Sequence, residues 1–301
     1  MTEGYKYIAY GLIIDSEIEL SALLESSGNA DISIRIGKVP EIQNARTNKG
    51  RKFFASDEAF LLSKENVAHF YVYGGTQIIV EPLTDIDSNE IRLFLLGSVF
   101  SALLHQRGYL VLHGSAIEMD GSATIFTGKS GAGKSTLAAA FAQKGYRVIT
   151  DDVCAIQVGN DGPPVLIPGF PQIKLWKDAA DRLTKDMSTA KPVKDGAEKY
   201  NFSAIDSHCS EPLPLREIYI ISPNDGDEIF IKQIESFQKI MQLIKNTYRF
   251  RFLKAQGGSS KHLEQCARVA EQVGIFALIR GNRKYHAEDV ATYLEERSKK
   301  S

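Results

Sequence analysis

The sequence has no long apolar run and no excess of charge of one sign, and each absence excludes a class of protein. No run reaches the roughly 18 apolar residues of a membrane span. The first residues, MTEGYKYIAY, lack the basic start and apolar core of a signal peptide. Lys and Arg (36) nearly balance Asp and Glu (37), so the net charge is −1 and attracts neither nucleic acid nor an anionic membrane. We therefore predict a cytoplasmic protein with no nucleic-acid or membrane partner.

Cysteine is scarce, and two signatures of familiar nucleotide-binding proteins are missing. Cys154, Cys209 and Cys266 are isolated and odd in number, which argues against a disulfide framework or a zinc site. The guanine-reading pattern Asn-Lys-x-Asp is absent, and so is the Leu-Ser-Gly-Gly-Gln stretch of transporter ATPases. These absences argue against a GTPase and against a transporter ATPase.

Residues 1–85 consist mainly of short runs with β-strand patterning. Polar and apolar residues alternate clearly in DISIRIG, and turn residues separate the runs. The segment SEIELSALLES is expected to add a short helix. His69 lies in the run VAHFYVY and is interpreted as a strand residue. We predict a small β-rich N-terminal domain over residues 1–85, without a catalytic constellation.

Residues 86–301 contain longer helical and strand patterns. DSNEIRLFLLGSVFSALLHQRG is typical of one long helix, capped by Ser88. The dipeptide Asp120-Gly121 separates two apolar runs and predicts a hairpin, because both residues tolerate positive φ. The resulting sheet is mixed. Further hairpins are expected at NDGP (160–163) and NDGD (224–227), and MSTAKPVKDGAEKYNFS (187–203) is expected to be a mobile loop near the site.

The stretch GKSGAGKS, residues 128–135, fits the pattern G-x-x-x-x-G-K-[ST] at every fixed position. Glycines let successive backbone N–H groups converge on phosphate, and the start of the following helix favours the anion. Lys134 is expected to reach the β- and γ-phosphates of ATP, and Ser135 to bind Mg²⁺. The alternative is a structural glycine turn. The predicted nucleotide-binding residues are Gly128, Lys129, Ser130, Gly131, Ala132, Gly133, Lys134, Ser135 and Thr136.

Asp151 and Asp152 end the next apolar run, so they are expected at the sheet edge beside the phosphates. One carboxylate suffices to place the metal, and the second could accept the proton of an attacking hydroxyl. The residues alone do not decide which aspartate has which role. His113 ends the strand before the hairpin and is expected to orient the nucleophile or sense the γ-phosphate. The alternatives are a solvated acidic pair and a buried structural histidine.

The segment from Leu112 to Ile156, with its order of histidine, hairpin, glycine-rich loop, helix and Asp-Asp, resembles the catalytic core of HPr kinase/phosphorylase. The resemblance implies an α/β fold over residues 86–301, a P-loop kinase core with a mixed sheet like that of HPr kinase and phosphoenolpyruvate carboxykinase. It implies catalytic roles for Lys134, Asp151 and His113, with Ser135 and Asp152 at the metal. The division of roles between the two aspartates stays open, with Asp151 preferred as the base and Asp152 as the metal-side ligand. The extra signature that accompanies phosphorylase activity in that family is not found.

The stretches IPGFPQIKLWKDA, EKYNF and NTYRFRFL resemble HPr-kinase-related enzymes of peptide natural-product pathways. This likeness implies an ATP-dependent serine kinase whose acceptor is a peptide or small protein, most closely the C-terminal serine of a lasso precursor peptide. It makes Lys174, Lys199 and Arg249 candidates for substrate contact, against the alternative of solvated surface charges. The other functions kept open are an HPr-type kinase/phosphorylase, a small-molecule kinase and a nucleotide-dependent sensor. The sequence also leaves open a homo-oligomer.

Overall fold

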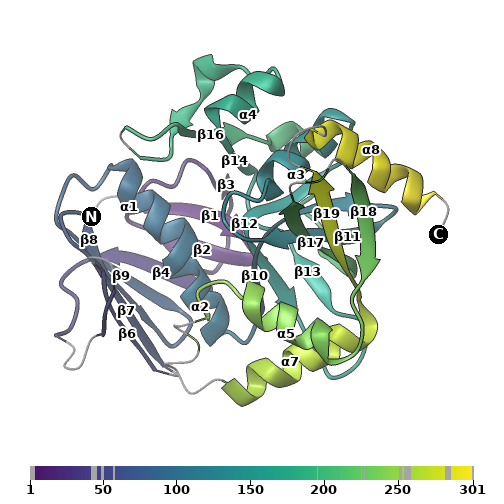
Figure 1. Ribbon diagram of the computed structural model, residues 1–301. Helices are drawn as coiled ribbons and strands as arrows, with labels where there is room; N and C mark the ends of the chain where they lie inside the picture. Colours follow the sequence, from purple (N-terminus) through teal and green to yellow (C-terminus); the bar gives the residue numbers. More distant parts are fainter. Residues whose placement is uncertain are drawn as a thin grey trace.

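The computed structural model describes residues 4–41, 46–48, 51–56, 58–194, 196–224, 226, 228–250, 253, 259–281 and 286–299. Its described strands form three sheets, which contain nine, seven and three strands. In Figure 1 the nine-stranded sheet lies on the left, the seven-stranded sheet on the right, and the helical segment α1–α2 runs between them. The fold is therefore mixed α/β, with few helices relative to strands.

The first sheet has the strand order β3-β1-β2-β4-β9-β8-β7-β6-β5. Its strands are β1 (Tyr5–Ala9), β2 (Leu12–Ser16), β3 (Leu24–Glu25), β4 (Ile32–Ile36), β5 (Arg46–Asn48), β6 (Arg51–Ala55), β7 (Ala59–Lys64), β8 (Ala68–Tyr73) and β9 (Gln77–Pro82). Strands thus occupy the β-patterned runs, and His69 lies in β8 as expected. The domain boundary at residue 85 stays a prediction, since one hydrophobic cluster joins this sheet to Val111 and Val153.

The short helix expected in SEIELSALLES is wrong. Residues 17–23 form turns instead, and β3 follows them. The Ser16 hydroxyl accepts a hydrogen bond from Ile18 N and donates one to Ile18 O, and the Tyr7 hydroxyl accepts from Leu20 N. Such side-chain bonds to nearby backbone compete with helix formation. In this segment these side-chain bonds pair the backbone N–H groups of Ile18 and Leu20, whose side chains are fully buried.

The helix predicted after residue 86 forms, but it is interrupted. Its parts are α1 (Asn89–Phe94), a π-helical turn η1 (Leu95–Val99) and α2 (Phe100–Gln106). Ser88 caps it as predicted, since its hydroxyl accepts a hydrogen bond from Glu90 N at 3.2 Å. A Cβ on Gly97, within the π turn, would lie 3.4 Å from the Tyr248 hydroxyl and 3.9 Å from Asp152 Oδ2. π turns of this kind are frequent at functional sites, and this one lets two polar groups approach the helix backbone.

The second sheet has the order β11-β10-β12-β13-β17-β19-β18, with an additional pairing of β11 and β17. Its strands are β10 (Leu110–Met119), β11 (Ser122–Gly128), β12 (Val148–Gln157), β13 (Val165–Ile167), β17 (Leu213–Asn224), β18 (Ile229–Gln233) and β19 (Gly274–Gly281). The predicted hairpin at Asp120-Gly121 is confirmed: β10 and β11 pair antiparallel, and both turn residues have positive φ. Because β11 and β17 are parallel, the sheet is mixed as predicted.

The hairpin expected at residues 224–227 is wrong, although the one at residues 160–163 is confirmed by the antiparallel pairing of β12 with β13. β19 lies between β17 and β18 and pairs with both, parallel to β17 and antiparallel to β18. Burial explains this order. Ile275 and Leu278 of β19 are fully buried, whereas β18 is only half-buried and takes the edge of the sheet.

The remaining elements surround these sheets. The third sheet has the order β14-β16-β15, with β14 (Gln172–Trp176), β15 (Lys191–Pro192) and β16 (Lys199–Ser203). Segment 187–203, expected to be a loop, therefore contains two strands. The other helices are α3 (Lys134–Gln143), α4 (Lys177–Arg182), α5 (Phe237–Asn246), α7 (Ser259–Gln272) and α8 (Ala287–Ser298), with short 3₁₀ turns η2 (Met187–Thr189) and η3 (Ile205–Ser207). In the described ranges, no helix is long and apolar enough to cross a membrane.

Candidate functional site

The glycine-rich loop joins the end of β11 to the start of α3. Gly128, Gly131 and Gly133 all have positive φ, between 82° and 143°. A Cβ on Gly128 would lie 2.7 Å from the Ile221 carbonyl oxygen, so no other residue fits there without a shift of backbone. A Cβ on Gly131 would meet nothing within 4 Å, because this glycine faces open space. The loop thus packs closely against β17 at Gly128, and its curled backbone is exposed at Gly131, just before α3 begins.

Lys134, the first residue of α3, folds back over this loop. Its side chain is buried, and its Nζ donates hydrogen bonds to the carbonyl oxygens of Gly128 and Lys129, at 3.2 and 3.1 Å. Burial lowers the pKa of the amine, and the carboxylates of Asp151 and Asp152 oppose that shift. Among the described residues, the Lys134 ammonium group is therefore held beside the loop by two neutral carbonyl oxygens and by no close ion pair.

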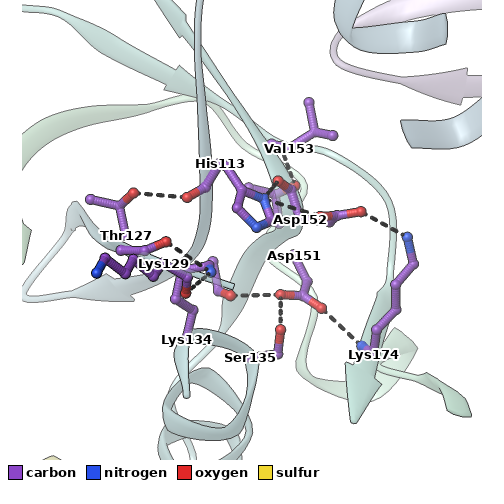
Figure 2. Close-up of polar contacts among 12 residues, drawn as sticks. His113, Thr127, Lys129, Lys134, Ser135, Asp151, Asp152, Val153 and Lys174 are labelled. Atoms are coloured by element: carbon purple, nitrogen blue, oxygen red, sulfur yellow. Dashed lines mark hydrogen bonds and ion pairs between the residues drawn. The ribbon is translucent and has the colours of Figure 1, made fainter. Parts of the chain in front are cut away.

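Asp151 lies on β12, and both of its carboxylate oxygens accept hydrogen bonds (Figure 2). Its Oδ1 accepts hydrogen bonds from Ser115 Oγ at 2.6 Å and from Ser135 Oγ at 2.8 Å. Its Oδ2 accepts from the backbone N of Lys174 at 2.8 Å. The residue is only 4% exposed. Asp151 is thus tied to the serine of the glycine-rich loop and is largely buried at the edge of the cavity.

Asp152 has different partners. Its Oδ2 lies 3.1 Å from Lys174 Nζ, and its Oδ1 lies 3.2 Å from His113 Nδ1. Burial disfavours the charged carboxylate, but Lys174 and His113 outweigh it and hold the pKa of Asp152 well below its usual range. The backbone of Asp152 has φ of +78°, an uncommon conformation for a residue with a Cβ, and such outliers concentrate at functional sites. Its side chain is 20% exposed, so this carboxylate is accessible from the cavity.

A cavity of about 1010 Å³ contains the loop and both aspartates in its lining. It extends to residues 245–249 on one side and to α4 and α8 on the other, and basic side chains outnumber acidic ones around it. Lys199 and Arg249 line this cavity, as do His113 and the predicted loop residues other than Ala132. Lys174 does not; its side chain is 8% exposed and pairs with Asp152. The sequence-predicted residues therefore gather at one site, with Lys174 behind a carboxylate.

Three residues of the site were not predicted from the sequence. Ser115 lies two positions after His113 on β10, and strand alternation, which puts both on one face, is the signal that could have found it. The ring centroids of Tyr248 and His113 lie 5.1 Å apart. Burial, and after it the negative charge of Asp152, raises the pKa of the Tyr248 hydroxyl to about 12. Arg280, at the end of β19, donates from Nη2 to Ala132 O at 3.2 Å. The last two come from distant strands and turns, so only the fold reveals them.

The described side chains offer few ligands for a metal ion. Within those ranges, no group of three or more His, Cys, Asp or Glu side chains gathers around one point. At the loop, Ser135 Oγ and Asp151 Oδ1 lie 2.8 Å apart. Two protein oxygens suit a hard cation that keeps several waters and takes its remaining ligands from phosphate, which is how Mg²⁺ is usually bound with nucleotides.

The turn that carries Tyr248 is held by buried histidines, which predicts a pH dependence of stability. His105 Nε2 donates to Tyr248 O at 3.0 Å, and burial lowers the pKa of His105 from 6.5 to about 4. Since the unfolded chain binds more protons between these values, stability falls as the pH falls through them. We expect His105 to lower the free energy of unfolding by about 2 kcal/mol between pH 7 and pH 5.

Urea denaturation at pH 7 and pH 5 measures this change. The control is His105→Gln, which keeps an N–H donor near Tyr248 O but does not titrate. His262 has a pKa of about 4 for the same reason and remains in the variant, so part of the pH dependence persists. Equal losses of stability in the wild-type protein and in the variant would show that His105 is not the titrating group.

Comparisons with known proteins add little to this geometry. No protein-family model matches the chain, and no curated protein matches its sequence. Among solved structures, the HPr(Ser) kinase/phosphatase from Coxiella burnetii matches with 10% identity and a TM-score of 0.34, over 63% of this chain and 91% of that chain. Its description names the family that the sequence resembles. At this TM-score the likeness carries no assignment, so the proposals below rest on the residues of this chain.

Proposed function

We propose that this protein is an ATP-dependent kinase that transfers the γ-phosphoryl group to a serine hydroxyl of a peptide or small protein. The observation that carries the proposal is the pair of adjacent carboxylates with different partners at one glycine-rich loop. Asp151 is tied to the loop serine, whereas Asp152 faces the cavity between His113 and Lys174. A nucleotide-binding sensor needs the first carboxylate only, and the second supports transfer to a hydroxyl.

The loop residues fit the triphosphate of ATP. Gly131 leaves open space where phosphate oxygens would approach the backbone, and Lys134 has neutral acceptors that phosphate can replace. Arg280 and Lys199 add positive charge to the same cavity. Ser135 and Asp151 would hold Mg²⁺, which supplies neutralisation of phosphate charge when it is bound.

The contacts support an exchange of the roles that the sequence preferred for the two aspartates. Asp151 has its oxygens engaged by two hydroxyls and a backbone N–H, which suits a positioned metal-side ligand. Asp152 is the more exposed carboxylate, and an incoming hydroxyl can donate a hydrogen bond to it from the cavity. In the transfer, the serine oxygen forms the new bond to phosphorus, the bond to the ADP oxygen breaks, and Asp152 receives the hydroxyl proton.

The acceptor is the finer part of the proposal. Lys199, Lys245 and Arg249 line the cavity and would attract an acceptor that carries negative charge, such as a terminal carboxylate. This supports, as its most specific form, the C-terminal serine of a lasso precursor peptide, for which the sequence resemblance remains the main support.

An acceptor panel tests the proposed function. The protein is incubated with γ-labelled ATP, Mg²⁺ and serine-containing peptides, each with a free or an amidated C-terminus, and the products are read by mass spectrometry. We expect one phosphate on serine, with the free carboxylate preferred. Transfer to small hydroxy compounds alone would replace the peptide acceptor, and nucleotide binding without any transfer would contradict the kinase assignment.

A further inference from the structure

A second pocket of about 290 Å³ lies beside the main cavity, and we call it the side pocket. It is bounded by residues 20–24, by the first turns of the α1–η1 segment and by the third sheet, the three segments that meet near the labels β3, α1 and β16 in Figure 1. Ser21, Lys191 and Ser203 in its lining are exposed, so the side pocket opens to solvent. It is at the small end of ligand pockets and suits one large side chain better than a cofactor.

The side pocket adjoins the proposed acceptor site. Leu93 lines both the side pocket and the main cavity. Lys174 lines the side pocket, while its Nζ binds Asp152 Oδ2. Figure 2 shows Lys174 on the side of Asp152 that faces away from Lys134. The length of one lysine side chain therefore separates the side pocket from the carboxylate that would receive the hydroxyl, a distance of about two residues of extended chain.

Polar and apolar side chains share the lining of the side pocket, but its most buried wall is apolar, and one buried polar atom there has no partner among the described residues. The buried wall side chains are Leu20, Leu23, Leu96, Val193 and Phe202. Asn201 also lines the side pocket, and its Oδ1 is buried without a hydrogen-bond partner in the described part of the chain. Leaving a buried amide oxygen unpaired is costly, which calls for an explanation. A ligand with an apolar body and a hydrogen-bond donor at its tip would satisfy both features.

The surroundings favour a peptide as the source of that group. Strand β3 forms one edge of the first sheet, and β15 forms one edge of the third, as far as the described strands go. Leu24 of β3 and Lys191 of β15 both line the side pocket. Sheet edges offer backbone donors and acceptors to an extended chain, and the alternate side chains of such a chain enter adjoining pockets.

We propose that the side pocket binds an aromatic side chain with a donor at its tip, such as tyrosine, within about two residues of the phosphorylated serine. The position of the phosphorylated serine in this inference rests on the proposed kinase function. The binding of the aromatic side chain in the side pocket does not depend on it. The buried apolar side chains of the side pocket hold the ring, and the Asn201 amide turns so that its Oδ1 accepts the hydrogen bond of the donor. Selection of the acceptor sequence by this kinase then occurs at the side pocket as well as at the basic lining of the main cavity.

Binding of labelled serine peptides, measured by fluorescence anisotropy, tests the inference. Four peptides differ only by Tyr, Phe, Ala or Glu at one position, and the set is repeated for each of the two positions on either side of serine. At one of these positions we expect Tyr to bind about tenfold more tightly than Ala, with Phe between them and Glu weakest. Asn201→Leu is expected to remove the difference between Tyr and Phe.

Two tryptophan variants provide a matched pair. Ser203→Trp places a bulky ring in the side pocket from its exposed rim, and Ser210→Trp places one at an exposed position outside both cavities. We expect the first to weaken binding of the Tyr peptide about tenfold and the second to leave it unchanged. Equal melting temperatures of the two variants establish that the fold is retained.

The outcomes separate the side pocket from the proposed function. Equal affinities for the four peptides at every position, or equal effects of the two tryptophan variants, would overturn the side pocket even if serine is phosphorylated. Preferential binding of the Tyr peptide without phosphoryl transfer would leave the side pocket standing and refute the kinase. Failure of every peptide to bind the wild-type protein would refute the side pocket as a peptide subsite.

Discussion

Replacing Lys134 by alanine is expected to reduce phosphoryl transfer by about 10³-fold or more, because the ammonium group would stabilise the charge of the phosphates in the transition state. The fold should be retained. Among the described residues, Lys134 Nζ bonds to two carbonyl oxygens of the loop and to no carboxylate, so its loss is expected to remove little stabilisation. Turnover with γ-labelled ATP, together with a thermal melt, measures both quantities.

Lys144→Ala is the matched control for this prediction. Lys144 follows the last turn of the same helix α3, and its Nζ pairs with Glu295 at 2.7 Å on the surface. A surface ion pair of this kind contributes about 0–1 kcal/mol, so the control should keep full activity. If Lys134→Ala retained near-normal turnover, the assignment of residues 128–136 to phosphate binding would have to be withdrawn.

Replacing each of the two aspartates by asparagine is expected to change different kinetic quantities. Asp152→Asn should lower kcat by about 10²-fold or more with little change in nucleotide affinity, because a base acts on the chemical step. Asp151→Asn should instead raise the Mg²⁺ concentration needed for half-maximal activity, because Ser135 loses its carboxylate partner. Steady-state kinetics over a range of Mg²⁺ concentrations, with nucleotide affinity by calorimetry, distinguish the two.

Stability gives a second readout for this pair. Asp152→Asn leaves Lys174 as a buried charge without its ion-pair partner, which is expected to cost about 3 kcal/mol of unfolding free energy. Asp206→Asn, at an exposed position in η3, is a control that should change neither stability nor activity. A metal defect in Asp152→Asn and a chemical-step defect in Asp151→Asn would restore the assignment that the sequence preferred.

The local features of the fold were predictable because single residues determine them. Asp120-Gly121 predicts the β10–β11 hairpin through its tolerance of positive φ, and GKSGAGKS predicts the curled loop before α3. Long-range pairing was not predictable in the same way. The insertion of β19 between β17 and β18 depends on which strand buries more apolar surface, and a pattern of two apolar runs around NDGD cannot show that.

The site likewise has features that the sequence could predict and features that it could not. The residue types and their spacing predict that Lys134, Ser135, Asp151, Asp152 and His113 lie together, as the structure has them. The sequence could not separate Asp151 from Asp152, since neighbours in sequence have nearly the same pattern around them. Their contacts differ through Ser115, Lys174 and Ser135, which reach them from β10, β14 and α3. The place of Tyr248 at the site and the formation of the side pocket likewise depend on segments that are distant in the sequence.

A single-turnover reaction tests the central claim most directly. Excess protein is mixed with γ-labelled ATP, Mg²⁺ and the best acceptor peptide, and the label is followed into phosphoserine and into inorganic phosphate. The account predicts that the label appears in phosphoserine in one phase, that Asp152→Asn slows this phase, and that little inorganic phosphate forms. Label that passes only to inorganic phosphate, at the same rate with and without peptide, would contradict it.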